Sequence, residues 1–168
     1  TYPLPFSTSL HVTKNGQNYD LDGLPFAFYR EPRPRFFDPP GGPRAGNTTV
    51  TLYGKYSGGS TKYCHFGEVG QVPATLRADP ERLVCSSPNS ENTPLSHTIT
   101  NVTHRLPVVL QVSLNGQQYE PIGEFGYYES PLFSFITPPS GPTRGGTQCT
   151  VRGRGLFANV QPGLDGAH

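Results

Sequence analysis

Two stretches of the chain that resemble each other decide its fold. Residues 10–31 read LHVTKNGQNYDLDGLPFAFYRE, and residues 110–130 read LQVSLNGQQYEPIGEFGYYES. After a one-residue deletion, FFDPPGGPRAGNTTVTLYG at residues 36–54 aligns with FITPPSGPTRGGTQCTVRG at residues 135–153. The residues that recur 100 positions later are Leu10, Val12, Asn15, Gly16, Gln17, Tyr19 and Gly23. A match of this length with one deletion is not a chance event, so the chain contains an internal repeat.

The length of the repeat indicates which structural unit is repeated. A period near 100 residues is too long for a solenoid repeat and fits a whole β-sandwich. The phase of the repeat divides the chain into the end of one module at residues 1–31, a complete module at residues 32–130 and the start of a further module at residues 131–168. We therefore predict that only the middle segment can bury a full core.

Composition favours short strands joined by turns. The chain has 20 Gly and 19 Pro, and both residues disfavour helix interiors, while aromatic residues still make up 11%. The net charge of +1 gives no strong field for nucleic acid or an anionic membrane. No apolar run approaches the roughly 20 residues of a membrane-spanning helix. These features predict an all-β protein.

Apolar residues alternate with polar ones in several stretches, which is typical of half-buried strands. Val50 and Leu52 share one face of such a stretch, and an Asn115-Gly116 turn, a strong hairpin signal, follows another. The proline-rich stretches 39–43 and 138–142 are predicted to be turns, because proline lacks the amide donor of a strand interior. The predicted strands cover residues 49–53, 63–66, 72–76, 83–85, 110–114 and 125–128.

Three motifs resemble the IPT/TIG family of immunoglobulin-like domains. Residues 135–153 resemble the family's opening pattern, P-x-x-GP-x-x-GGT-x-V-x-I-x-G. YCHFG at 63–67, followed by VPAT at 72–75 and LVCSSP at 83–88, is similar to the paired-cysteine middle of plexins and Met-type receptors. NGQQY at 115–119 is similar to the family's close and to filamin-type repeats of adhesion and ciliary proteins. The resemblance implies tandem immunoglobulin-like β-sandwiches, one complete and two partial.

The same resemblance implies a disulfide between Cys64 and Cys85. The two cysteines are 21 positions apart and lie on strands that neighbour each other in the related fold. Closing a loop of this size contributes about 3 kcal/mol to stability. The alternative is two reduced cysteines that pack as small hydrophobic residues. Cys149 is predicted to lie on the same inward face as Val151, where a buried core thiol is favoured over a reactive one, and a partner for it beyond His168 is left open.

Two sequons make Asn47 and Asn101 candidate glycosylation sites. About one sequon is expected by chance in a chain with this composition, so the motifs alone prove little. Asn47 lies in a predicted turn and Asn101 in a polar insertion, where a glycan would be tolerated.

No motif indicates catalysis or a metal. Asp20 and Asp22 could suggest calcium, but the counterpart of this stretch at residues 120–123 has one acid, which favours a solvated hairpin. The five histidines lack metal-ligand spacing, and no nucleophile elbow, P-loop or zinc-protease motif occurs. A small basic cluster is interpreted as a solvated linker face; its members are Arg30, Arg33 and Arg35. We predict a protein that is not an enzyme and has no cofactor or metal.

The linkers between modules suggest a mechanical function. Proline occurs at positions 32, 34 and 131, where one module's last strand passes into the next module's first strand, and it restricts the backbone there. We therefore predict a stiff rod or filament in a large multi-module surface or extracellular protein, with a structural or adhesion role. The expected partners are other protein subunits, including copies of itself, with no nucleic acid and no membrane insertion by this fragment.

Two other classes of protein compete with this interpretation. An intracellular filamin-like scaffold of a cilium or cytoskeletal assembly would keep all three cysteines reduced. A DNA-binding Rel-type module would need basic loops that the chain lacks. A carbohydrate-processing enzyme would need paired carboxylates, for which the sequence offers no candidate.

Overall fold

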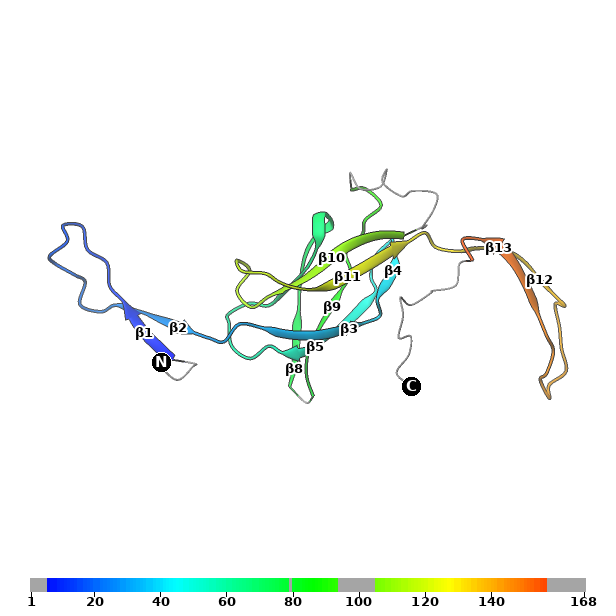
Figure 1. Cartoon of the computed structure of the whole chain (residues 1–168), viewed down its shortest axis with the longest axis horizontal. Helices are drawn as coiled ribbons and strands as arrows, with labels where there is room; N and C mark the ends of the chain where they lie inside the picture. Colours follow the sequence, from blue (N-terminus) through cyan, green and yellow to red (C-terminus); the bar gives the residue numbers. More distant parts are fainter. Residues whose placement is uncertain (1–5, 79, 94–104, 157–168) are drawn as a thin grey trace, which may run out of the picture. The chain divides into compact units, whose positions relative to one another are not determined.

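The computed structural model describes residues 6–78, 80–93 and 105–156. The chain divides into two compact units, residues 1–128 and residues 129–168. Figure 1 shows strands throughout the described residues, with a single short 3-10 helix, η1 (Gly67–Val69). The strands of the first unit are β1 (Phe6–Leu10), β2 (Leu24–Phe28), β3 (Arg33–Asp38), β4 (Gly41–Pro43), β5 (Thr49–Lys55), β6 (Tyr63–Phe66), β7 (Gly70–Pro73), β8 (Thr75–Ala78), β9 (Glu81–Ser86), β10 (Arg105–Ser113) and β11 (Glu120–Tyr128). The second unit contains β12 (Leu132–Thr137) and β13 (Thr150–Arg154).

Strands β3 to β11 form an immunoglobulin-like β-sandwich. The first sheet has the strand order β3-β5-β9-β8, and the second has the order β4-β11-β10-β6-β7. Pairing is antiparallel except between β4 and β11, which run parallel. Packing two sheets face to face encloses one core, as expected for this architecture. The predicted all-β fold with an immunoglobulin-like β-sandwich is confirmed.

The core lies between the two sheets and follows the alternation seen in the sequence. Val50 and Leu52 on β5 are fully buried, whereas the threonines beside them are not. An aromatic cluster fills the space opposite, with the ring of Phe66 5.2 Å from Phe125 and the ring of Phe125 5.1 Å from Tyr127. Edge-to-face packing at these distances stabilises a core beyond the burial of area alone. The buried apolar residues are Val50, Leu52, Tyr56, Cys64, Phe66, Leu83, Cys85, Leu106, Val108, Leu110, Val112, Leu114, Phe125 and Tyr127.

One proline-rich stretch that was predicted to be only a turn contains a strand. Gly41–Pro43 form β4, which pairs with β11. Because β4 is an edge strand, its proline needs no donor on the outer side. The stretch instead provides acceptors, and the backbone N–H of Gly126 donates to the carbonyl of Pro40 at 3.0 Å. Proline is disfavoured in a strand interior but is tolerated at this edge, so the prediction of a turn alone at residues 39–43 was wrong.

The strand predicted at residues 72–76 is two strands in different sheets. β7 pairs with β6 in the second sheet, and β8 pairs with β9 in the first. The chain crosses between the sheets at Ala74, whose N–H donates to the carbonyl of Lys62 at 2.9 Å. A change of partner sheet leaves the local alternation of side chains intact, so the sequence pattern did not indicate it.

The connection between β10 and β11 is longer than a two-residue Asn-Gly turn. β10 ends at Ser113 and β11 begins at Glu120. The hydroxyl of Ser113 accepts a hydrogen bond from the N–H of Gly116 at 2.8 Å, and the side-chain oxygen of Asn115 accepts one from the N–H of Gln117 at 3.0 Å. Short polar side chains that accept from the following backbone stabilise such turns.

The connection between β1 and β2 has the same side-chain hydrogen bonds as the connection between β10 and β11. The hydroxyl of Thr13 accepts from the N–H of Gly16 at 3.1 Å, and the side-chain oxygen of Asn15 accepts from the N–H of Gln17 at 3.0 Å. Thr13 and Asn15 lie 100 positions before Ser113 and Asn115. The internal repeat is therefore visible as repeated hydrogen bonding as well as repeated sequence.

The strand register extends the equivalence of the two hairpins. Phe26 lies opposite Thr8 and Phe28 opposite Phe6, as Phe125 lies opposite Val108 and Tyr127 opposite Leu106. Phe26 is 51% exposed, whereas its counterpart Phe125 is fully buried. The β1–β2 hairpin thus presents to solvent the face that β10–β11 buries against the first sheet.

The second unit repeats the start of the sandwich. β12 and β13 pair antiparallel with an irregularity between Phe133 and Phe135, as β3 and β5 do between Pro34 and Phe36. Phe135 lies opposite Arg152, at the position where Phe36 lies opposite Tyr53. Every residue of β12 and β13 is exposed.

Candidate functional site

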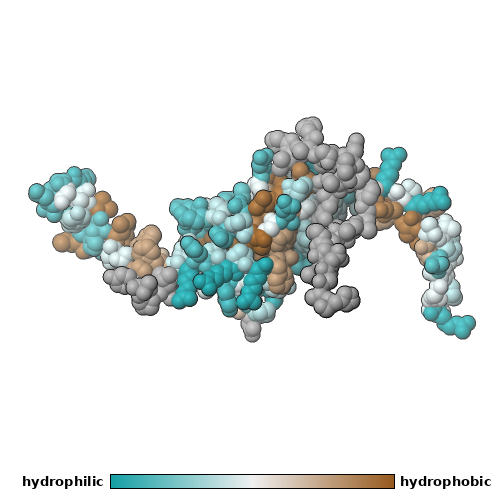
Figure 2. Space-filling view, in the orientation of Figure 1, coloured by the Kyte–Doolittle hydropathy of each residue, from teal (hydrophilic) through white to brown (hydrophobic). Residues whose placement is uncertain are grey.

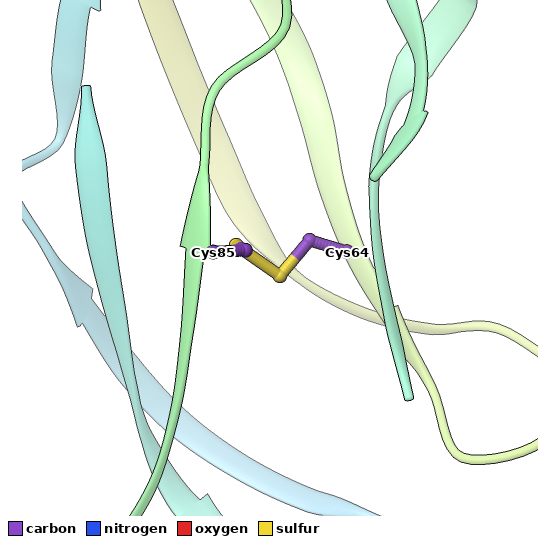
Figure 3. Close-up of a disulfide and its surroundings, with 2 residues drawn as sticks. All are labelled: Cys64 and Cys85. Atoms are coloured by element: carbon purple, nitrogen blue, oxygen red, sulfur yellow. A yellow bond between two sulfur atoms is a disulfide. The ribbon is translucent and has the colours of Figure 1, made fainter. Parts of the chain in front are cut away.

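The structure joins Cys64 to Cys85 by a disulfide (Figure 3). Cys64 lies on β6 of the second sheet and Cys85 on β9 of the first, with a Cα–Cα distance of 6.5 Å. The family resemblance predicted that the two cysteines lie on neighbouring strands. In the structure, the two strands face each other across the core and are not paired in one sheet.

The strand pattern explains why both sulfur atoms point inward. Cys64 lies opposite Val112 and Cys85 lies opposite Val50, and both valines are fully buried. Because residues directly opposite each other in a sheet share a face, each cysteine points into the core. The bond therefore ties an inner strand of one sheet to an inner strand of the other and closes a loop that contains η1, β7 and β8.

The prediction for Cys149 was wrong. Its thiol is free and exposed, and Val151, expected on the same inward face, is 45% exposed. The apolar face of β12–β13 has no facing sheet among the residues that the structure describes, so nothing covers the thiol. Its Sγ lies 3.8 Å from the carbonyl oxygen of Thr147.

Asn47 is in a position that a glycan can occupy. Its side chain is exposed, and its backbone has φ 61°, a left-handed conformation that asparagine tolerates better than most residues. The N–H of Asn47 donates to the carbonyl of Ser87 at 2.8 Å, which holds the residue in place. Attachment of a glycan would displace no buried group. The second candidate, Asn101, lies outside the described residues.

Asp20, one of the two aspartates considered as calcium ligands, forms hydrogen bonds within the β1–β2 hairpin. Asp20 accepts hydrogen bonds from the N–H groups of Val12 and Gly23, and its carboxylate lies 3.7 Å from His11. The hydrogen bond from the N–H of Val12, then the one from the N–H of Gly23 and the charge attraction of the nearby His11, hold the pKa of Asp20 below its usual range. Across residues 6–78, 80–93 and 105–156, no group of three or more His, Cys, Asp or Glu side chains could hold a metal ion.

Two buried tyrosines, Tyr56 and Tyr127, have raised pKa values because they are packed in the core. Burial raises the pKa of Tyr127, and its hydroxyl donates to the carbonyl of Pro88 at 2.9 Å. Burial, and then the nearby charge of Glu81, raise the pKa of Tyr56. Both phenols stay protonated at physiological pH and contribute to the core.

The described part of the chain contains no helix with the length and hydropathy needed to cross a membrane.

Comparison with known proteins finds structural likenesses among solved structures. No family model matches the sequence. Among solved structures, the chain is similar to the extracellular region of Plexin A4, domains 1 to 10, with 22% sequence identity and a TM-score of 0.47. The match covers 66% of this chain and 8% of the plexin chain, so it spans a small part of that protein's length. The immunoglobulin-like fold rests on the strand order, and the IPT/TIG assignment remains a prediction.

The sequence did not indicate a buried arginine in the loop after β4. Arg44 is 8% exposed, and its guanidinium donates to the carbonyl of Ser90 at 3.4 Å. The N–H of Ser90 donates back to the carbonyl of Arg44 at 2.8 Å. Arginine is rarely buried, and no local pattern reveals such a partner 46 positions away. Arg30, Arg33 and Arg35, the predicted basic cluster, are exposed.

Proposed function

We propose that the chain is a non-catalytic structural or adhesion segment of a large multi-module surface or extracellular protein, built from tandem IPT/TIG-type modules. The observation that carries the proposal is the equivalence of strand pairs. β1–β2 repeats β10–β11, the close of the sandwich, and β12–β13 repeats β3–β5, its start.

Exposed apolar faces support the division into modules at residues 1–31, 32–130 and 131–168. The apolar side chains of β1–β2 occupy the positions of core residues in β10–β11, yet they are largely in contact with solvent. Contiguous exposed apolar surface of this kind usually marks a surface that is covered in the native protein. We infer that the remaining strands of each outer module cover these faces.

The joints between modules support a stiff rod. β2 ends at Phe28 and β3 begins at Arg33, while β11 ends at Tyr128 and β12 begins at Leu132. Linkers this short, each containing proline, leave the backbone few conformations. At the first joint, Tyr29 packs against the core of the sandwich.

The first joint offers a direct test of stiffness. A side chain at Gly58 would collide with Tyr29, so this glycine permits the tyrosine to pack closely. We expect the double change Tyr29→Ala and Pro32→Gly to free the β1–β2 hairpin, because it removes both the anchor and the backbone restriction. In ¹⁵N relaxation measurements, the hairpin amides should share the correlation time of β5 in the unchanged chain and show a shorter one in the variant.

The matched control for this experiment is Leu21→Ala. Leu21 is 97% exposed in the hairpin's connection, so its removal should leave the relaxation of the hairpin unchanged. If the hairpin already reorients independently in the unchanged chain, the joint is flexible and the rod is excluded.

The disulfide supports an oxidising compartment, because buried disulfides persist in secreted and surface proteins and are rare in the cytosol. In the protein isolated from its native source without reduction, we expect the peptides containing Cys64 and Cys85 to be linked, with a combined mass about 2 Da below that of the two thiols. We also expect hexose-containing glycans on Asn47, on Asn101 or on both. Free thiols together with unmodified asparagines would instead support the intracellular filamin-like scaffold.

A further inference from the structure

We propose that the outer face of the β3-β5-β9-β8 sheet binds an acidic polypeptide surface that also carries aromatic side chains. Such a surface would belong to a protein partner in the structural or adhesion role proposed above, and this inference rests on that role. The basic–aromatic face, as we call it, consists of Arg33, Phe36, Tyr53, Lys55, Arg77 and Arg82.

The strand register places these residues on one side of the sheet. Phe36 lies opposite Tyr53, Tyr53 opposite Arg82, and Arg82 opposite Arg77, so one continuous row crosses all four strands. Leu52 and Leu83, next to this row, are fully buried, so the row points away from the core. Four strands about 4.8 Å apart make the row about 14 Å wide, which is larger than a single anion.

A stacked aromatic pair, with Phe36 exposed and Tyr53 half-buried, occupies one end of the row. The rings of Phe36 and Tyr53 stack with centroids 4.5 Å apart and an interplanar angle of 16°. Phe36, on the edge strand β3, is 56% exposed. Figure 2 shows mainly hydrophilic residues over the region where Figure 1 places β3, β5 and β8. The strand register places the aromatic pair beside arginine and lysine side chains on the outer face of the sheet, where it can contact a partner.

The other end of the row carries like charges directly opposite each other. Arg77 faces Arg82, and in the neighbouring row Arg33 faces Lys55. Such pairs destabilise a sheet unless anions lie between or above them. Lys55 forms an ion pair with Glu81 at 3.6 Å, but within the described residues no ion pair involves Arg33, Arg77 or Arg82. The sheet thus holds three arginines available to an acidic partner.

The second unit carries a related arrangement at the equivalent position. Phe135 lies opposite Arg152, and the guanidinium carbon of Arg152 is 5.6 Å from the centre of the Phe135 ring. Arg154 follows at the position of Lys55. Basic and aromatic side chains therefore recur on the same strand pair in both units. The recurrence of this arrangement on an equivalent strand pair suits a partner whose acidic and aromatic side chains bind each unit in the same way.

The side-chain types favour a protein partner. Arginine and tyrosine are concentrated at the energetic centres of protein–protein interfaces, whereas lysine is depleted there. On the basic–aromatic face, the cations that form no ion pair with another described residue are arginines, whose planar guanidinium groups bind carboxylates through two parallel hydrogen bonds. Aromatic rings on the partner would pack beside Phe36 and Tyr53. An anionic polysaccharide would satisfy the charges but would make no comparable use of the aromatic pair.

The test compares three soluble polyanions as probes: a random Glu/Tyr copolymer, poly-Glu of similar length and dextran sulfate. Fluorescence anisotropy of each labelled probe is measured with the whole chain at low and moderate ionic strength. We expect the copolymer to bind more tightly than poly-Glu, with binding weakened by salt. The variant R77A/R82A should bind the copolymer about tenfold more weakly. The variant F36A/Y53A should remove the preference for the copolymer over poly-Glu.

A matched control distinguishes binding by the basic–aromatic face from a general effect of the chain's net charge. K14A/R30A removes the same charge from exposed positions outside the basic–aromatic face and should leave copolymer binding unchanged. R77A/R82A should unfold at the same or a higher urea concentration than the unchanged chain, because it removes a like-charge pair. Equal weakening by both double variants would overturn the proposal, as would binding of none of the probes. Binding of dextran sulfate alone would assign the face to an anionic polysaccharide. None of these results bears on the joint or the compartment, which have their own tests.

Discussion

Replacing both Cys64 and Cys85 by alanine is expected to lower the free energy of unfolding of the sandwich by about 3 kcal/mol. The bond restricts the unfolded chain by closing a loop between residues 21 positions apart, and its loss returns that conformational freedom. For a module of this size, the midpoint of thermal unfolding should fall by roughly 15 °C. Urea titration followed by far-UV circular dichroism measures the difference.

Cys149→Ala is the control for the chemistry of the substitution. Its thiol is exposed and unbonded, so the change should alter the free energy of unfolding by less than about 0.5 kcal/mol. Chemical reduction of the unchanged chain should reproduce the effect of the double variant. If the oxidised and reduced chains unfold at the same urea concentration, the disulfide does not stabilise the sandwich, and this prediction is wrong.

The features that the sequence predicted correctly depend on local periodicity. Val50 and Leu52 alternate with polar residues, and such alternation has one physical solution, a strand with one face in a core. The repeat predicted a second hairpin like β10–β11, and the structure shows the same side-chain hydrogen bonds in both connections. Local patterns carry this information because the interactions that they reflect are themselves local.

The features that were missed depend on partners that are distant in the sequence. Pro43 is compatible with β4 only because β4 lies at an edge, which is a property of the sheet and not of the residue. Cys149 has an apolar pattern around it, but burial also requires a facing sheet. The row from Phe36 to Arg77 joins four strands whose register no single stretch of sequence specifies. Of the site residues, the Cys64–Cys85 pair was anticipated through family resemblance, and its position across the core came from the structure.

Phe125→Ala is expected to lower the free energy of unfolding of the sandwich by about 3–5 kcal/mol, because it leaves a large cavity in the core. The ring is fully buried and packs edge-to-face against Phe66 and Tyr127. The neighbouring aromatic rings are themselves confined by both sheets, so they cannot collapse into the space. The same urea titration reports the change, and a loss below about 1 kcal/mol would contradict this description of the core.

Phe26→Ala is the counterpart of this change and tests the division into modules. Phe26 occupies the position of Phe125 in the repeat but is half exposed, so in this chain its removal should change stability by less than about 1 kcal/mol. In a longer chain that contains the complete preceding module, the same ring should lie in a core, and its loss should then destabilise that module by about 3–5 kcal/mol. The substitution and the hairpin are identical in both chains. A larger effect in the longer chain would therefore show that the preceding module covers the β1–β2 face. If Phe26→Ala has the same small effect in the longer chain, residues 1–31 do not close a module, and the exposed face must have another partner.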